Sequence, residues 1–259
     1  MPSFLELHRP GEPLLCPNPW DTGSAVLLAS LGFRALATTS SGFAATLGRL
    51  DGDTTPEETL SSAAAIVAAV SVPVTADLED GYADTPEGVA STVRQAVAAG
   101  LAGCSIEDWS GDHVYAIDVA AARVKAAATA AGGQIVLTAR ADSHVHGFDD
   151  LDDTIARLQA FDAAGAHVLY APGLEQINDI KRVVEAVSRP VNVLLRAGGP
   201  SVSELAAAGV ARITVGGGFA FAALGALTEA ALEIRDEGTT EYARLSKVGQ
   251  QAAAAAFRH

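Results

Sequence analysis

A phrase repeated along the chain constrains its fold more than any other feature. A helix-like run ends in a glycine, and a short strand-like run rich in β-branched residues follows at once, as in ASLGFRALATTS, AAGLAGCSIED, DAAGAHVLYAP and AAAGVARITVGG. The glycines occupy the position where a helix C-terminus needs left-handed backbone, which glycine adopts at no steric cost. They are Gly32, Gly100, Gly165 and Gly209. Each copy therefore predicts a helix followed directly by a strand.

Two more strands open with proline, in VPVTAD and RPVNVLL, because proline ends the preceding helix. Together with two further apolar runs they bring the predicted strand cores to eight. The cores are Leu14–Pro17, Ala35–Thr39, Val74–Asp77, Cys104–Glu107, Val136–Arg140, Val168–Ala171, Val191–Leu195 and Arg212–Gly216. Helical runs are predicted between them, for instance at Pro56–Val70, Pro86–Ala99, Tyr115–Ala131, Asp150–Ala163 and Glu175–Val187.

Alternation of strand and helix at intervals of roughly 20–40 residues predicts parallel βαβ units. Eight such units in a chain of 259 residues predict a (β/α)8 TIM barrel. No linker or charge block divides the chain, so we expect a single domain over residues 1–259. A doubly wound open sheet is the alternative, but no G-x-G-x-x-G follows the first strand to support its dinucleotide-binding form.

Charge and composition exclude several classes of protein. The chain has 17 Lys and Arg against 31 Asp and Glu, which argues against a nucleic-acid partner because phosphates are bound by basic side chains. With 49% hydrophobic and 19% charged residues it does not resemble a disordered chain. Two cysteines cannot form a disulfide framework, and we see neither a signal peptide nor an apolar run of about 20 residues. We therefore expect a cytoplasmic protein with no membrane partner.

Polar side chains gather where the predicted strands end, which is where barrel enzymes place their active sites. Asp77, Glu79 and Glu107 follow two successive strands and should lie side by side. Three neighbouring carboxylates repel one another unless a cation is present, and Mg²⁺ (or Mn²⁺) takes such oxygen ligands. The alternative is that each carboxylate caps a helix or pairs with an arginine. Asn192 is a candidate substrate-binding residue at the same face.

Arg140 ends the strand in VLTARAD and is the candidate for binding an anionic substrate. Its planar guanidinium can hold a carboxylate or phosphoryl group through two hydrogen bonds. Alternatively, it forms an ion pair with Glu107 that stabilises the fold. Ser40, Ser41 and Gly42 form a turn of small residues whose consecutive N–H groups could bind an anion.

Other side chains carry weaker signals. Gly216–Gly218, after the last strand, is either a phosphate loop like that of many barrels or a tight turn. Cys16 and Cys104 lie within predicted strands, which favours buried apolar positions over a nucleophilic role. His144 and His146 alternate on a predicted loop, where a zinc site would need a third ligand that the sequence does not identify.

Several phrases, taken together, resemble the isocitrate lyase/phosphoenolpyruvate mutase superfamily over most of the chain. They are PNPWDTGSAVLLASLGFRALATTSSGFAATLGRLDGD, PVTADLEDGYAD, AAGLAGCSIED, LTARAD, PVNVLL and SVSELAAAGVARITVGGG. The resemblance implies a Mg²⁺-dependent barrel enzyme. Such an enzyme would make or break a C–C or P–C bond in a small 2-oxo or 2-hydroxy carboxylate, through an enolpyruvate-like species.

By motif position, the resemblance implies a direct metal ligand at Asp77 and three acidic residues that hold the ion through its waters. These are Glu79, Glu107 and Asp51. A turn of small residues would cradle the substrate carboxylate, and Arg140 would bind the other end of the substrate. The turn comprises Ser40, Ser41 and Gly42. A metal and backbone donors in these places would stabilise an enolate oxygen as charge develops on it.

Two departures from the family pattern bear on the reaction. The family's D-x-D phrase reads D-L-E here, with Glu79 in the second place. The lyases carry K-x-C-G-H, with an acid/base cysteine, in the loop after Glu107, whereas this chain reads EDWSGDHVYAIDVAAARV and also lacks the mutases' loop lysine and asparagine. These departures argue against an ordinary isocitrate lyase, methylisocitrate lyase or phosphonomutase. Asp112, His113 or a metal-bound water would then have to act as the acid/base.

We therefore expect a lyase-like or decarboxylase-like enzyme. A hydrolase of a C–C or C–P bond and a barrel that binds an oxo acid without turnover are the alternatives. The alanine-rich segment Glu241–Phe257 has little polar surface of its own and needs burial against another surface. The resemblance suggests a homodimer or homotetramer in which this C-terminal helix packs on a neighbouring subunit.

Overall fold

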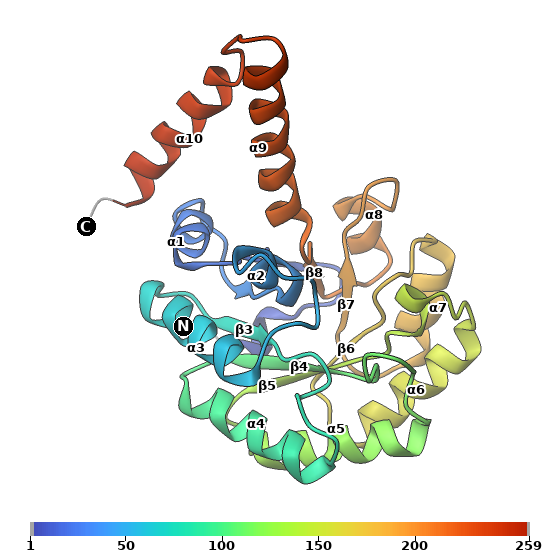
Figure 1. Cartoon of the computed structure of the whole chain (residues 1–259). Coiled ribbons are helices and arrows are strands. Elements are labelled where there is room, and N and C mark those ends of the chain that lie inside the picture. Colours follow the sequence, from blue (N-terminus) through green and yellow to red (C-terminus); the bar gives the residue numbers. More distant parts are fainter. Residues whose placement is uncertain (1–2, 258–259) are drawn as a thin grey trace.

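The computed structural model describes residues 3–257, which form an eight-stranded parallel sheet curled into a barrel-like ring (Figure 1). The strands are β1 (Leu14–Leu15), β2 (Leu36–Ala37), β3 (Val74–Asp77), β4 (Gly103–Glu107), β5 (Val136–Arg140), β6 (Val168–Tyr170), β7 (Val191–Leu194) and β8 (Arg212–Thr214). They are hydrogen-bonded in the order β1-β8-β7-β6-β5-β4-β3-β2. One backbone hydrogen bond, from the Ala37 N–H to the Pro17 carbonyl at 3.1 Å, joins the two ends of the sheet.

Helices follow the strands and surround the sheet (Figure 1). They are α1 (Thr22–Ser30), α2 (Ser40–Thr46), α3 (Pro56–Ala69), α4 (Pro86–Ala98), α5 (Ile117–Ala131), α6 (Leu151–Ala163), α7 (Ile177–Ala186), α8 (Val202–Ala207), α9 (Gly218–Asp236) and α10 (Ala243–Ala256). The predicted left-handed glycines are confirmed, with φ of +78° at Gly100 and +103° at Gly165. Aliphatic side chains such as Ile66, Leu137 and Leu158 fill the core between helices and sheet. The eight-stranded α/β architecture expected from the repeated phrase is therefore observed.

Helices α9 and α10 extend away from the ring, and α10 turns back toward α1 (Figure 1). Apolar side chains on this pair of helices are exposed to solvent. They are Phe219, Phe221, Leu224, Leu227, Leu232, Ile234, Leu245 and Val248, with Phe257 just after α10. Within residues 3–257, we find no helix with the length and apolar character needed to cross a membrane.

The inside of the ring is polar in part, beside a buried apolar cluster that includes Leu14, Val136 and Val168, whereas barrel interiors are usually filled by Val, Ile and Leu throughout. Thr138, Asn192, Arg212 and Thr214 are buried there in one hydrogen-bonded group. His8, just after a 3₁₀ turn at Leu5–Leu7, reaches this group from the N-terminal end of the barrel. Its Nδ1 lies 3.0 Å from the Phe4 carbonyl and its Nε2 lies 3.4 Å from Nη1 of Arg212. These partners fit a neutral imidazole that donates through Nδ1 and accepts at Nε2.

The buried imidazole of His8 makes stability depend on pH. Burial, and secondly the positive charge of Arg212, lower the pKa of His8 from 6.5 to about 3. The unfolded chain keeps the ordinary value, so it takes up a proton below pH 6.5 that the folded chain does not. The contribution of neutral His8 to stability is fully present above pH 6.5 and is lost as the pH falls toward 3. The expected loss is about 1.4 kcal/mol for each pH unit within that window.

A His8→Gln variant, whose side chain does not titrate, should therefore lose stability less steeply than the wild type between pH 6.5 and about pH 4.5. Urea unfolding at a series of pH values measures this difference, because the other titrating groups are common to both proteins. Parallel pH profiles for the two proteins would contradict the lowered pKa.

Candidate active site

A cavity of about 150 Å³ lies at the carboxyl ends of the strands and extends into the ring. Its lining combines residues from the loops after β1, β2 and β8 with inward side chains of the strands. The polar lining residues are Asn18, Thr38, Thr39, Ser40, Ser41, Asp51, Thr75, Asp77, Ser105, Arg140, Tyr170, Asn192, Arg212 and Thr214. The asymmetric placement of polar residues seen in the sequence thus corresponds to one concave site.

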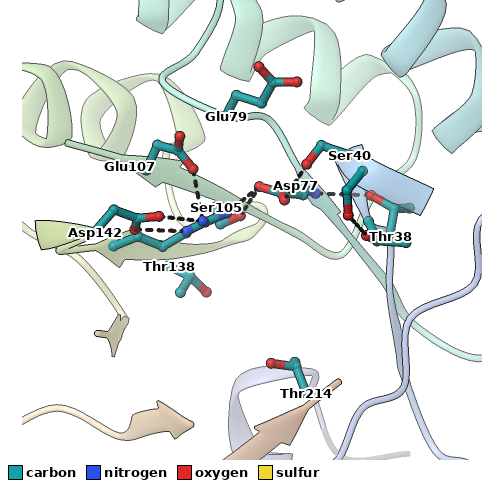
Figure 2. Close-up of polar contacts among 12 residues, drawn as sticks. Thr38, Ser40, Asp77, Glu79, Ser105, Glu107, Thr138, Asp142 and Thr214 are labelled. Carbon is teal, nitrogen blue, oxygen red and sulfur yellow. Dashed lines mark hydrogen bonds and ion pairs between the residues drawn. The ribbon is translucent and has the colours of Figure 1, made fainter. Parts of the chain in front are cut away.

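Asp77 ends β3 and lies at the centre of the polar contacts in Figure 2. Its Oδ1 accepts hydrogen bonds from Nη1 of Arg140 at 2.8 Å and from the Ser105 hydroxyl at 3.1 Å. Its Oδ2 accepts one from the Ser40 hydroxyl at 3.2 Å. The Thr38 hydroxyl accepts from the Asp77 N–H at 3.0 Å. Contacts with residues from three neighbouring segments therefore fix the orientation of this carboxylate.

Arg140 ends β5 and joins three carboxylates. It lies 2.8 Å from Asp77, 2.9 Å from Glu107 and 2.6 Å from Asp142. Burial opposes the charge on the guanidinium, but Asp142, Glu107 and Asp77 together raise its pKa well above the ordinary value. The ion pair with Glu107, one of the two expected roles, is therefore present. Arg140 also places a positive charge on the cavity wall, as its anion-binding role requires.

Glu79 lies in the loop after β3, in left-handed backbone with φ of +49°. The Tyr82 hydroxyl donates to its Oε1 at 3.0 Å. Burial first, and then the negative charge of Asp77, raise the pKa of Glu79 to about 7. Burial likewise raises the pKa of Glu107, with Asp142 and Asp77 adding to the effect against the attraction of Arg140. Glu79, Glu107 and Asp77 thus form an acidic cluster in which the proton affinity of the two glutamates is raised.

The turn predicted at Ser40, Ser41 and Gly42 is instead the first turn of helix α2, which Thr39 caps. The Gly42 N–H donates to the Thr39 hydroxyl at 3.3 Å, so this amide is already engaged within the chain. Helix formation at this point was missed because the short run SSGFAAT has no strong amphipathic period. Ser40 and Ser41 do line the cavity, whereas Gly42 is packed against Trp20, Thr39 and Ala220.

Asp112 and His113 are not part of the cavity lining. They lie on the loop after β4, with side chains 85% and 63% exposed. Both contact the Ser110 hydroxyl, and the hydrogen bonds from Ser110 and His113 lower the pKa of Asp112. The structure therefore does not bring the two expected acid/base residues to the carboxylates, because their loop folds on itself outside the site.

The residues with weaker sequence signals lie in a turn, in the core and in a stacked pair of rings. The Gly218 N–H donates to the Val215 carbonyl at 3.0 Å, which forms a tight turn, and Gly216 and Gly217 of this turn line the cavity. The Val215 and Gly216 N–H groups are already engaged, because both donate to Oδ1 of Asn18, at 2.9 and 3.0 Å. Burial raises the pKa of Cys16 and that of Cys104 to about 12, which fits apolar core positions. His146 stacks on Trp109 with ring centroids 3.6 Å apart.

Among the charged residues that line the cavity, Arg212 was not singled out in the sequence. Arg212 starts β8 and is 3% exposed. The signal was available, because Arg212 and Thr214 alternate with apolar Ile213 and must both face the inside of the ring.

The acidic cluster has the donor chemistry of a site for a divalent metal ion. Among residues 3–257, no group of three or more His, Cys, Asp or Glu side chains converges closely enough to hold a metal without other ligands. Mg²⁺ typically takes one or two carboxylates and keeps several waters, so such convergence is not required. Asp77 and Asp51 line the cavity, and the charges of both raise the pKa of Glu79. An all-oxygen donor set whose members repel one another fits a hard divalent cation.

The family of the chain follows from comparison with known proteins. The family model for phosphoenolpyruvate phosphomutase matches residues 4–235. The chain belongs to the phosphoenolpyruvate mutase/isocitrate lyase superfamily. The resemblance found in the sequence is thereby confirmed.

Individual members of the superfamily align with most of this chain. The uncharacterized protein Rv1998c of Mycobacterium tuberculosis is 32% identical, with 90% of this chain and 89% of that protein covered. The 2-methylisocitrate lyase of Escherichia coli is 27% identical, covering 72% and 70% of the two chains. The solved structure of a candidate lyase/mutase from Burkholderia cenocepacia J2315 is 48% identical, with a TM-score of 0.90 over 93% of this chain and 90% of that one.

Other superfamily relatives are named as an oxaloacetate decarboxylase, a 2,3-dimethylmalate lyase and an oxaloacetate acetylhydrolase. Members related to this chain are thus lyases, mutases, decarboxylases and hydrolases of small oxo or hydroxy acids.

Proposed function

We propose that this chain is a Mg²⁺-dependent lyase-type enzyme that cleaves or forms a C–C or P–C bond in a small 2-oxo or 2-hydroxy carboxylate, through an enolpyruvate-like intermediate. The observation that carries the proposal is the convergence of Ser40, Asp77 and Arg140 on one cavity wall. A cavity of about 150 Å³ admits a ligand of roughly benzene size, which matches a small oxo acid. Membership of the superfamily supports the same class of reaction.

Mg²⁺ would be bound by Asp77, with Glu79, Glu107 and Asp51 around its waters. When bound, it supplies a Lewis acid that polarises the substrate's 2-oxo oxygen. Ser40 and Ser105 keep the Asp77 carboxylate oriented through their hydroxyls. Ser41, at the start of α2, and the guanidinium of Arg140 contribute hydrogen-bond donors for the substrate carboxylate. Because these groups are held by the fold before the substrate binds, little reorganisation is needed as negative charge develops.

A decarboxylase is the second candidate, and one observation favours it. Within the described part of the chain, the cavity lining holds no Cys, Lys or His, and its two carboxylates, Asp77 and Asp51, are the proposed metal ligands, so no lining side chain is left to deprotonate a substrate hydroxyl. Aldol-type cleavage of a 2-hydroxy acid needs such a base. Loss of CO₂ from a 2-oxo acid needs charge stabilisation at the oxo oxygen but no base.

The test is to incubate the protein and Mg²⁺ with oxaloacetate, 2-methylisocitrate, 2,3-dimethylmalate and phosphonopyruvate, and to identify the products by NMR. Pyruvate and CO₂ from oxaloacetate would establish a decarboxylase, and oxalate with acetate a hydrolase. Cleavage of either hydroxy acid would establish the lyase. Mg²⁺-dependent binding without turnover would indicate a barrel that only binds an oxo acid. Neither binding nor turnover of any of the four would overturn the proposal.

We also propose that the protein assembles as a homodimer or homotetramer through α9 and α10. The apolar side chains exposed on these helices would be covered by a neighbouring subunit. Light scattering at micromolar concentration should give a mass of two or four times 26.3 kDa. Replacing Leu227 and Ile234, which are 65% and 53% exposed, by serine should shift the mass toward the single chain. A mass of 26.3 kDa for the wild type would contradict the prediction.

A further inference from the structure

Arg212 is a buried cation whose partners are all neutral. Its Nε–H donates to Oδ1 of Asn192 at 3.0 Å, and an Nη2–H donates to the Thr138 hydroxyl at 3.1 Å. An Nη1–H points to Nε2 of His8 at 3.4 Å. A guanidinium carries five N–H donors, so these contacts leave one N–H on each terminal nitrogen for another acceptor.

The other buried arginines of the barrel have carboxylate partners. Arg123 lies 3.0 Å from Asp80 and Arg157 lies 3.2 Å from Asp108. Within residues 3–257, Arg212 has no Asp or Glu oxygen within 4.0 Å, although the chain has 31 acidic residues. A buried charge without a counter-ion is costly to the fold, and a bound anion would remove that cost.

The cavity reaches this arginine. Arg212, Asn192 and Thr214 line it together with Asp77 and Arg140. Thr138 precedes Arg140 by two residues on β5, about 7 Å along the strand, so the guanidinium of Arg212 contacts the ring one layer deeper than the backbone position of Arg140. Thr138, on β5, and Thr214, on β8, both lie below the contacts of Asp77 in Figure 2. A ligand held at Asp77 can therefore extend inward toward a second positive charge.

We propose that Arg212, with Asn192 and Thr214, forms an inner subsite that binds the distal carboxylate of a small dicarboxylic oxo or hydroxy acid. The inference rests on the proposed function, because the other end of the acid is placed at Asp77 and Ser40. Such a subsite favours a substrate with two negatively charged carboxylates, and it disfavours acids whose other end is a methyl group. Arg140 cannot serve both ends, since its bonds to Asp77, Glu107 and Asp142 leave a single N–H, on Nη1, for a ligand.

The test compares malate with lactate, which differ only in that malate carries a second carboxylate on its terminal carbon. Calorimetric titration in saturating Mg²⁺ should show that the wild type binds malate at least about tenfold more tightly, the usual gain from a charge-assisted contact. In Arg212→Met this preference should disappear, while lactate affinity stays within about twofold. Arg189→Gln, which removes a half-exposed arginine paired with Asp162, is the control for net charge and should keep the preference.

Asn192→Asp provides a second variant in case Arg212→Met does not fold. It places a carboxylate 3 Å from the guanidinium, in nearly the same shape, and supplies the counter-ion from the chain itself. The malate preference should again be lost, and thermal unfolding should show a protein at least as stable as the wild type.

Four results would overturn the inner subsite. Equal Mg²⁺-dependent binding of malate and lactate by the wild type would do so while leaving the proposed function intact. A malate preference that survives in Asn192→Asp and in folded Arg212→Met would do the same. Tighter binding of the phosphonate analogue of malate would overturn the assignment to a carboxylate. Binding of neither acid would count against the metal and anion sites of the proposed function as well as against the subsite.

Discussion

Asp77→Ala is expected to lower the affinity for Mg²⁺ in the presence of oxalate by more than 100-fold, and to abolish turnover. Asp77 is the carboxylate that lines the cavity at the centre of the acidic cluster, and Ser40, Ser105 and Arg140 hold it in place. Loss of a residue that only supports a metal ligand costs about 10–100-fold in affinity, so loss of the ligand should exceed that range. Titration calorimetry on the wild type and the variant, with oxalate as an enolate mimic, measures the effect.

Asp142→Ala is the matched control for this experiment. Asp142, like Asp77, is an ion-pair partner of Arg140, at 2.6 Å, but it does not line the cavity. If metal binding depends on Asp77 as a ligand, Asp142→Ala should keep most of the Mg²⁺ affinity although it perturbs Arg140 in a similar way. Equal Mg²⁺ affinity in the wild type and Asp77→Ala would show that the acidic cluster is not the metal site.

Arg140→Met should lower the free energy of unfolding by about 3–5 kcal/mol, because it leaves the carboxylates of Asp77, Glu107 and Asp142 without their counter-ion. Arg140→Lys keeps the charge but loses the planar fork that reaches Asp77, Glu107 and Asp142 together. We expect this variant to lose less stability and to bind oxalate or pyruvate more weakly by about 1.5–3 kcal/mol. Urea unfolding without ligand and calorimetry with ligand measure the two effects separately.

Arg157→Lys separates the structural from the binding role of a buried arginine. Arg157 is paired with Asp108 at 3.2 Å and Asp153 at 2.6 Å and does not line the cavity. It should lose stability, as Arg140→Lys does, without loss of ligand affinity. If Arg140→Lys also lowers stability and leaves affinity unchanged, Arg140 serves only the fold and the anion-binding assignment is wrong.

The parts of the structure that the sequence predicted well are those set by local chemistry. Gly100 and Gly165 end helices because only glycine takes positive φ without strain, and short apolar runs after them can only be strands. Eight repeats of that unit are compatible with few architectures. The strand order, and the position of Asp77 and Glu107 at the same edge of the sheet, could therefore be predicted. The position of Arg140 at the carboxyl end of β5 was predictable for the same reason.

Long-range contacts were the part that the sequence did not predict. Nothing in the local sequence says that Arg140 reaches Asp77, 63 residues away, as well as Glu107. The position of His113 depends on a loop whose hydrogen bonds to Ser110 turn it outward. The inward direction of Arg212 follows from its alternation with Ile213, but its access to the cavity depends on the depth of the ring.

The closure of the ring has a mechanical consequence. Among residues 3–257, a single backbone hydrogen bond, from the Ala37 N–H to the Pro17 carbonyl, links β2 to the segment after β1. The side chain of Asn18 adds a second link by donating to the Thr38 carbonyl at 3.0 Å. Oδ1 of Asn18 also accepts hydrogen bonds from the Val215 and Gly216 N–H groups, so one side-chain amide links the ends of β1, β2 and β8. Local opening is easiest where few backbone bonds must break. We therefore expect the barrel to open most easily between β1 and β2, directly before Ser40.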